Sequence, residues 1–125
     1  FHESNGFTYL AQVPYNGPAC GIAQIEEPTF DWLVHQVLPK NPKLSLKFTK
    51  ISPNYPNIPF NELFWNLKLC VALCRLRYFV VPTKLPEDTI DGRAAYWSKY
   101  YQTSNDPAKT KLFIQHSKQL EQLLK

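Results

Sequence analysis

Hydrophobic residues recur at helical spacing in several separate stretches of this chain. In residues 61–81, apolar side chains cover most of the helical circumference, which predicts a long, buried central helix. Similar but shorter patterns predict helices over residues 28–39 and 86–102. Asp106 is followed by proline, an N-cap arrangement that opens a final helix reaching about residue 124. These patterns predict a mainly α fold.

Two parts of the chain lack this helical pattern. Residues 39–59 contain five prolines, a density that excludes a long helix, and within them residues 43–51 alternate polar and apolar side chains. That alternation predicts a short strand. We expect residues 1–3 to be the end of a helix whose larger part is cut away or lies outside this sequence. Residues 4–20 contain turn-forming pairs, so we expect a loop there, with a short hairpin around residues 8–13.

Length and composition are those of one domain spanning residues 1–125. Aromatic residues are abundant, with three Trp, seven Tyr and eight Phe, a content that suits a core and equally a sugar-binding cleft. No apolar run reaches the roughly 18 residues that a membrane span requires. No secretory signal is visible, but the first residue is not Met, so a leader can be missing from this sequence.

The formal net charge is +4, and the basic residues are dispersed along the chain. A modest positive excess fits an anionic polymer such as peptidoglycan or nucleic acid, although dispersed charges are more often a solvated surface. Without a clustered basic stripe or a recognition motif, no nucleic-acid partner is expected.

The three cysteines and three histidines do not suggest a metal or cofactor site. Cys70 and Cys74 lie one helical turn apart, where a disulfide is geometrically awkward, so we predict buried free thiols. Cys20 belongs to a loop, and the histidines are far apart in sequence. No metal-binding spacing is present, and no cofactor is expected.

A candidate catalytic group lies at the start of the chain, where Glu3 precedes a polar, glycine-containing loop. This order predicts a carboxyl at the floor of a cleft with the loop as one wall. Cleavage of a glycosidic bond needs such a carboxylic acid, with a pKa raised by apolar surroundings. A lone Glu at a helix end is usually a surface carboxylate, so the hypothesis depends on its neighbours.

Those neighbours carry a family resemblance. Glu3-Ser4 followed by Gly21-Ile22-Ala23-Gln24-Ile25 resembles the Glu-Ser and Gly-Leu-Met-Gln motifs of the soluble lytic transglycosylases. These enzymes cleave peptidoglycan, belong to glycoside hydrolase family 23 and are related to goose-type lysozyme. Residues 94–101 fall where the family has Ala-Tyr-Asn, and residues 66–78 fall where it has its central helix. The likeness covers nearly the whole chain and is nearest to the transglycosylase-like domains of bacteriophage and phage-tail proteins.

The resemblance implies a lysozyme-like fold of the α+β superfamily, with a buried central helix and a proline-rich excursion that forms a helix or irregular loop over residues 43–51. It makes Glu3 the catalytic acid. It also implies a set of substrate-binding or site-forming residues: Ser4, Ile22, Ala23, Gln24, Tyr96 and Tyr100. In this set Ser4 steadies Glu3 or touches the substrate, and Tyr96 hydrogen-bonds or flanks Glu3.

Two residues depart from the family pattern. Ala23 replaces Met, which we expect to open space near the sugar, and Trp97 replaces Asn, which removes an amide. Gln24 lies between apolar residues and must find a hydrogen-bond partner.

The implied activity is muramidase-type cleavage of the β-1,4 bond between N-acetylmuramic acid and N-acetylglucosamine, with Glu3 acting alone and a 1,6-anhydro product. A hydrolase of the same fold needs a second carboxylate roughly 6.5–9.5 Å from the first, and the candidates are Glu26, Glu27 and Asp31. Acids at a helix entrance are also explained by the helix dipole, so the single-carboxylate route is favoured.

Other outcomes remain open at this point. The chain can be a catalytically inactive cell-wall-binding module or a virion structural module that kept the fold. Its expected partners are peptidoglycan glycan strands and the other parts of a phage or phage-tail-like assembly. Its expected place of action is the cell wall, in the periplasm or outside the cell, and virion-associated in the phage case.

Overall fold

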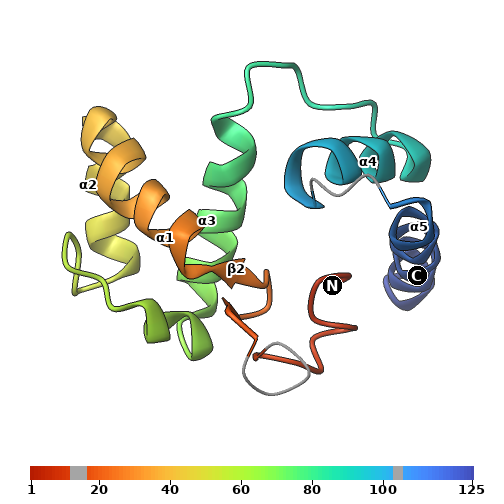
Figure 1. Ribbon diagram of the computed structural model, residues 1–125, viewed down its shortest axis with the longest axis horizontal. Helices are drawn as coiled ribbons and strands as arrows, with labels where there is room; N and C mark the ends of the chain where they lie inside the picture. Colours follow the sequence, from red (N-terminus) through yellow and green to blue (C-terminus); the bar gives the residue numbers. More distant parts are fainter. Residues whose placement is uncertain (12–16, 103–105) are drawn as a thin grey trace.

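The computed structural model describes residues 1–11, 17–102 and 106–125, and these ranges are mainly helical (Figure 1). This confirms the predicted class. The α-helices are α1 (Glu27–Trp32), α2 (Pro42–Ile51), α3 (Leu67–Phe79), α4 (Ile90–Trp97) and α5 (Pro107–Leu123).

Shorter elements extend or precede these helices. A π-helical turn, Leu33–Val37, and a 3-10 turn, Leu38–Lys40, continue α1. A second π-helical turn, Ser98–Gln102, continues α4, and a 3-10 turn, Phe60–Phe64, precedes α3. Two short strands, β1 (Ala19–Cys20) and β2 (Ile25–Glu26), pair antiparallel.

The helices form two groups (Figure 1). α1, α2 and α3 pack together around the main core, and α4 packs with α5 on the other side of the molecule, where the connection after α3 leads. The N-terminal segment and β2 lie between the two groups in this view. The innermost side chains of the main core are 1% exposed or less, and they include Phe30, Leu33, Leu38, Leu63, Leu69 and Leu73.

The predicted central helix is shorter and less buried than its sequence pattern indicated. α3 begins after Asn66, whose side-chain oxygen accepts a hydrogen bond from the Leu69 N–H at 3.1 Å. The helix lies centrally in Figure 1, but its buried residues lie on one side. Val71 is 56% exposed and Phe79 is 57% exposed. The apolar composition of the segment therefore predicted more burial than this helix has.

The strand predicted over residues 43–51 is wrong, because this segment is helix α2. Leu44, Phe48 and Ile51 share one helical face and pack toward the core, whereas Leu46 is 65% exposed. Short alternating runs contain the same i, i+4 apolar pairs as a helix, and the proline at position 42 occupies the first helical position, where proline is favoured.

The remaining boundaries follow local capping. α4 begins at Ile90 because the Thr89 hydroxyl accepts a hydrogen bond from the Gly92 N–H at 3.0 Å, four residues later than predicted. The Asp106 cap and the final helix are confirmed. Residues 12–16, which contain part of the predicted hairpin, lie outside the described residues, and Ala11 forms an isolated bridge with Cys20.

The cysteines are all free. Cys70 is buried and donates its S–H to the Leu63 carbonyl at 3.0 Å, whereas Cys74 is half-buried. Across the described ranges, no helix has both the length and the hydrophobicity that crossing a membrane requires.

A buried carboxylate joins the 3-10 turn to α3. Glu62 is fully buried, and its two carboxylate oxygens accept hydrogen bonds from the side-chain amides of Asn54 at 2.9 Å and Asn66 at 2.7 Å. Burial by itself raises the pKa of Glu62, but the hydrogen bonds from Asn54, Asn66 and Ser52 outweigh burial, so the pKa lies below its ordinary value.

Replacing this carboxylate should destabilise the protein in a pH-dependent way. Glu62→Gln places an amide against two amide donors, and we expect it to lower the free energy of unfolding by about 1–3 kcal/mol near neutral pH. The contribution of Glu62 is present above the unfolded-state pKa and is lost as pH falls through the lowered folded-state pKa. The difference between wild type and variant should therefore shrink in urea denaturation at about pH 3. The exposed Glu87→Gln is the matched control, and an equal loss there would contradict the assignment.

Candidate active site

A tight turn holds Glu3 in place. The Gly6 N–H donates to the Phe1 carbonyl at 2.9 Å, and the Asn5 N–H donates to the His2 carbonyl at 3.2 Å. The same two hydrogen bonds end many helices at their C-termini, together with one residue in the left-handed conformation. Asn5, with φ +48°, is that residue here. Glu3 thus occupies a fixed backbone position immediately before the chain reverses.

Aromatic packing fixes the same segment to α4 and α5. The His2 ring lies with its centroid 4.7 Å from that of Trp97, and its Nδ1 lies 3.0 Å from Nδ1 of His116 on α5. Burial and the neighbouring His116 lower the pKa of His2 to about 4, so the ring is neutral near pH 7. Trp97 in turn stacks on Phe113 at 4.9 Å between centroids.

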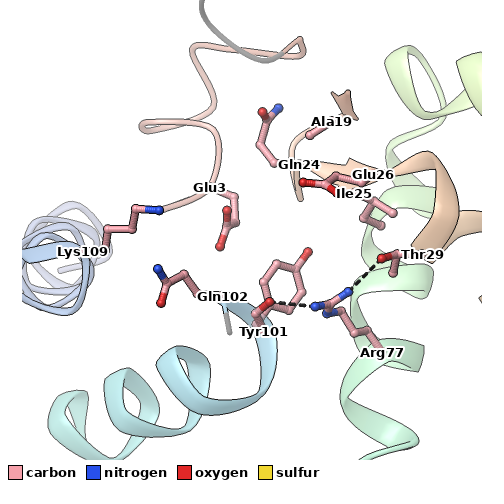
Figure 2. A pocket seen from close by; sticks show the side chains of 10 residues that line it. All are labelled: Glu3, Ala19, Gln24, Ile25, Glu26, Thr29, Arg77, Tyr101, Gln102 and Lys109. Atoms are coloured by element: carbon pink, nitrogen blue, oxygen red, sulfur yellow. Dashed lines mark hydrogen bonds between the residues drawn. The ribbon is translucent and has the colours of Figure 1, made fainter. Parts of the chain in front are cut away.

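Glu3 faces a cleft of about 510 Å³ between the two helix groups (Figure 2). Figure 2 shows its carboxyl directed into the cleft, with Lys109 and Gln102 toward one side and Glu26 toward the other. The lining combines the N-terminal segment, the strands and the start of α1 with residues of α3, the π-helical turn after α4 and α5. It consists of Glu3, Ala19, Gln24, Ile25, Glu26, Thr29, Arg77, Tyr101, Gln102 and Lys109.

The Glu3 carboxyl is half-buried, and its Oε1 accepts a hydrogen bond from the Trp97 indole N–H at 2.5 Å. Burial raises the pKa of Glu3 above its ordinary value. The Trp97 hydrogen bond and the positive charges of the Phe1 amino group, Arg77 and Lys109 act in the opposite direction without cancelling the effect. The carboxyl therefore holds its proton to a higher pH than an exposed glutamate does.

Arg77 lies at the opposite wall of the cleft, on α3. Its guanidinium donates to the Thr29 hydroxyl at 3.2 Å and to the Tyr101 carbonyl at 2.7 Å, and it lies 4.6 Å from the Tyr101 ring centroid. No carboxylate of the described residues forms an ion pair with Arg77 or Lys109. The cleft thus presents two cations to whatever occupies it.

Tyr101 connects the two walls at the base of the cleft. Its hydroxyl donates to the Ala23 carbonyl at 2.5 Å, and its ring stacks on Tyr78 at 5.4 Å between centroids. Burial raises the pKa of Tyr101 well above its ordinary value, so the hydroxyl remains a donor at any physiological pH. This bond ties the loop after β1 to the π-helical turn after α4.

The loop with the Gly-Ile-Ala-Gln motif is shaped by two left-handed residues. Gly21 has φ +73°, and a Cβ there would lie 2.5 Å from the Cys70 sulfur and 2.7 Å from the Leu63 carbonyl oxygen, so only glycine fits. Gln24 has φ +47°. Its side-chain amide donates to the Gly21 carbonyl at 2.9 Å, which is the partner that its apolar surroundings required.

Only some of the site residues predicted from the sequence line the cleft. Glu3 and Gln24 line one cleft. Ser4 is fully buried outside the cleft lining, and its hydroxyl accepts a hydrogen bond from the Phe7 N–H at 3.1 Å, which steadies the loop. Ile22 is half-buried and packs against the core. Ala23 is 7% exposed and does not line the cleft, and its carbonyl accepts a hydrogen bond from the Tyr101 hydroxyl.

Tyr96 and Tyr100 do not line the cleft that Glu3 faces. These two tyrosines pair at 4.6 Å between ring centroids and line a different hollow with the segment after α3, where the Tyr96 hydroxyl is 3.5 Å from the Thr83 carbonyl. Neighbouring residues of a helix point about 100° apart, so Tyr101, which follows Tyr100, lines the cleft instead, and Trp97, which follows Tyr96, is directed toward Glu3. Trp97, which was expected to remove a useful amide from the site, supplies an indole N–H that donates to Glu3.

Sequence reasoning missed most of the remaining lining. Tyr101 followed by Gln102 is a tyrosine next to a side-chain amide, and this polar pair near the end of a predicted helix is a signal that could have marked both residues as cleft lining. Arg77 and Lys109 carry no local signal, because they reach the cleft only through the packing of α3 and α5.

Of the three candidates for a second carboxylate, only Glu26 lines the cleft, and Figure 2 shows its carboxyl directed inward. Glu27 lies outside that lining. Asp31 also lies outside it, with its carboxylate 3.9 Å from Nε2 of His35. No group of three potential metal ligands exists in the ranges that the structure describes.

Comparisons with protein-family profiles, curated proteins and solved structures found no match. What the cleft does must therefore be argued from its geometry and from the motifs in the sequence.

The indole hydrogen bond can be tested without any assay of activity. Trp97→Phe keeps an aromatic ring against Phe113 but removes the N–H that favours ionised Glu3, so the pKa of Glu3 should rise further. A carboxyl carbon NMR titration of Glu3 measures this directly. The exposed Trp32→Phe is the control, and an unchanged Glu3 titration in Trp97→Phe would show that the indole does not control the carboxyl.

Proposed function

We propose that this protein is a peptidoglycan-cleaving lytic transglycosylase with a lysozyme-like fold, in which Glu3 is the catalytic acid. The observation that carries the proposal is a half-buried carboxyl with a raised pKa, directed into a cleft and hydrogen-bonded by Trp97. The resemblance of residues 3–4 and 21–25 to the motifs of that family supports the same conclusion.

In the proposed reaction, protonated Glu3 donates its proton to the bridging oxygen between N-acetylmuramic acid and N-acetylglucosamine. The substrate's own N-acetyl group stabilises the positive charge that develops at the sugar. Ionised Glu3 then takes the proton from the C6 hydroxyl as that oxygen attacks the anomeric carbon. The bond between the anomeric carbon and the bridging oxygen breaks when that oxygen is protonated, so the later attack closes a 1,6-anhydro ring and leaves Glu3 protonated again.

One carboxyl can serve as acid and then as base only if both of its charge states are accessible. Burial favours the protonated state in which Glu3 must begin. The Trp97 N–H, Arg77 and Lys109 favour the ionised state that exists between the two proton transfers. The surroundings of Glu3 therefore suit a group that changes charge within one catalytic cycle.

The cleft also suits the proposed substrate. Its lining is largely polar and contains two side-chain amides, Gln24 and Gln102, which is typical of sites that bind sugars. Arg77 and Lys109 are placed to attract the carboxylates of muramic acid and its attached peptides. The protein would act on the cell wall, as a free enzyme or within a phage or phage-tail-like assembly.

A second candidate is an inverting hydrolase of the same fold. It is favoured by one observation, the inward-directed carboxyl of Glu26 across the cleft from Glu3. In that reaction Glu26 would deprotonate a water molecule that attacks the anomeric carbon, and the product would have a reducing muramic acid end.

Glu3→Gln tests the catalytic assignment. The amide cannot donate a proton, so release of soluble fragments from peptidoglycan should fall at least about 100-fold. The fold should be unchanged by circular dichroism, because Gln retains an oxygen that can accept the Trp97 hydrogen bond. If wild type releases no fragments, the protein is not this enzyme, and an inactive wall-binding or virion module becomes the better description.

Glu26→Gln separates the two chemistries. A transglycosylase should retain most of its rate in this variant and leave 1,6-anhydro-muramic ends, which mass analysis of the digest detects. A hydrolase should lose at least about 100-fold and leave reducing ends in the wild-type digest. Glu27→Gln is the matched control, since Glu27 is adjacent and exposed but lies outside the cleft lining.

A further inference from the structure

Charge is distributed very unevenly along this chain. Residues 32–86 contain eight lysines and arginines but a single acidic residue, Glu62, which is fully buried. The rest of the chain has nine acidic residues against six basic ones. The half of the molecule that contains α2 and α3 is therefore strongly basic, although the net charge of the whole chain is only +4.

Part of this basic region forms a groove that is separate from the Glu3 cleft. The groove has a volume of about 580 Å³ and lies between the first turns of α2 and the end of α3. It shares no lining residue with the catalytic cleft. Three lysines line it without any acidic residue, and the complete lining is Lys40, Asn41, Pro42, Lys43, Leu44, Lys47 and Phe79. We call it the lysine groove.

The lysines of the groove have no ionic partner among the residues that the structure describes. All three are exposed, and none forms an ion pair with a carboxylate of the described residues. Phe79 is 57% exposed and adds an apolar surface beside the charges. A concave surface with several unpaired cations and an exposed ring is favourable for an anion that also has hydrocarbon groups.

The scaffold beneath the lysine groove is well fixed. Phe48 and Leu44 hold α2 against the core, and the Ser45 hydroxyl donates to the Leu38 carbonyl at 2.6 Å. The Tyr55 hydroxyl donates to the same Ser45 oxygen at 2.9 Å. The lysines therefore extend from an ordered helix, with Lys43 and Lys47 one turn apart on the same face.

We propose that the lysine groove binds a phosphodiester polymer of the cell wall, a chain of polyol phosphates. Lysine ammonium groups bind phosphate as point charges, whereas planar carboxylates are better matched by the fork of arginine, which the groove lacks. The CH groups of a polyol would contact Phe79 and Leu44. The choice of a wall polymer over other polyanions rests on the proposed action on peptidoglycan.

Two other polyanions fit the groove less well. Single-stranded nucleic acid is held by several aromatic side chains that stack on successive bases, and the groove has only Phe79. An anionic membrane requires a broad apolar face that enters the lipid, whereas on α2 the only large exposed apolar side chain is Leu46, which lies among lysines. Binding at the lysine groove would hold the enzyme on the wall while the Glu3 cleft stays open to glycan strands.

The test is equilibrium binding of fluorescently labelled poly(glycerol phosphate), followed by anisotropy across a series of NaCl concentrations. Wild type should bind, with an affinity that falls linearly on a logarithmic salt scale. The triple variant Lys40→Gln, Lys43→Gln, Lys47→Gln should bind roughly tenfold or more weakly, with a salt slope lower by about two. The triple variant Lys111→Gln, Lys118→Gln, Lys125→Gln removes the same charge from the other side of the protein and should lose less than about threefold.

Four results would overturn the proposal. These are no wild-type binding at about 50 mM NaCl, an equal loss in both triple variants, tighter binding of a single-stranded oligonucleotide of equal charge, and tighter binding of phosphatidylglycerol vesicles. Binding does not require Glu3, so it is measured independently of cleavage. The lysine-groove variant should digest peptidoglycan stripped of polyol phosphate at the wild-type rate. Failure of cleavage with intact binding would refute only the proposed function.

Discussion

The contact between the Glu3 carboxyl and the Trp97 indole is the interaction on which the candidate site depends. It joins a residue from the first turn of the chain to one from α4, so it forms only when the N-terminal segment lies between the two helix groups. The His2 and Phe113 rings pack around the same indole and hold it in place beside the carboxyl. Position, burial and protonation of Glu3 therefore have a common origin in this small aromatic cluster.

Around Glu3, burial favours the protonated carboxyl, whereas a hydrogen bond and positive charges favour the ionised one. A carboxylate with a purely structural role does not need both influences. Glu62 shows the contrast, since it is fully buried but has amide donors on both carboxylate oxygens, and its pKa lies below the ordinary value. Glu3 has one neutral donor and only more distant positive charges, and its pKa lies above the ordinary value. One carboxyl is fixed in its ionised state to hold α3, whereas the other is left able to accept and release a proton.

Local signals in the sequence predicted the features that local interactions determine. The Asp106 cap and the helix predicted to begin at residue 28 are read from a few neighbouring residues, and the structure has a helix at each. α2 was mispredicted because a short alternating run is compatible with either periodicity, and only packing against the core decides. The cleft was recovered incompletely for the same reason. Arg77 and Lys109 enter it through tertiary packing, which no motif records.

The π-helical turn Ser98–Gln102 has a consequence for how such a site can change through evolution. Its hydrogen bonds span five residues instead of four, so it contains extra chain relative to an α-helical turn, and it delivers Tyr101 and Gln102 to the cleft. Each residue of a helix rotates the next by about 100°. A sequence one residue shorter here would keep every functional group and yet turn the Tyr101 hydroxyl away from Ala23. Insertions and deletions at this turn would thus alter the site more than many substitutions within it.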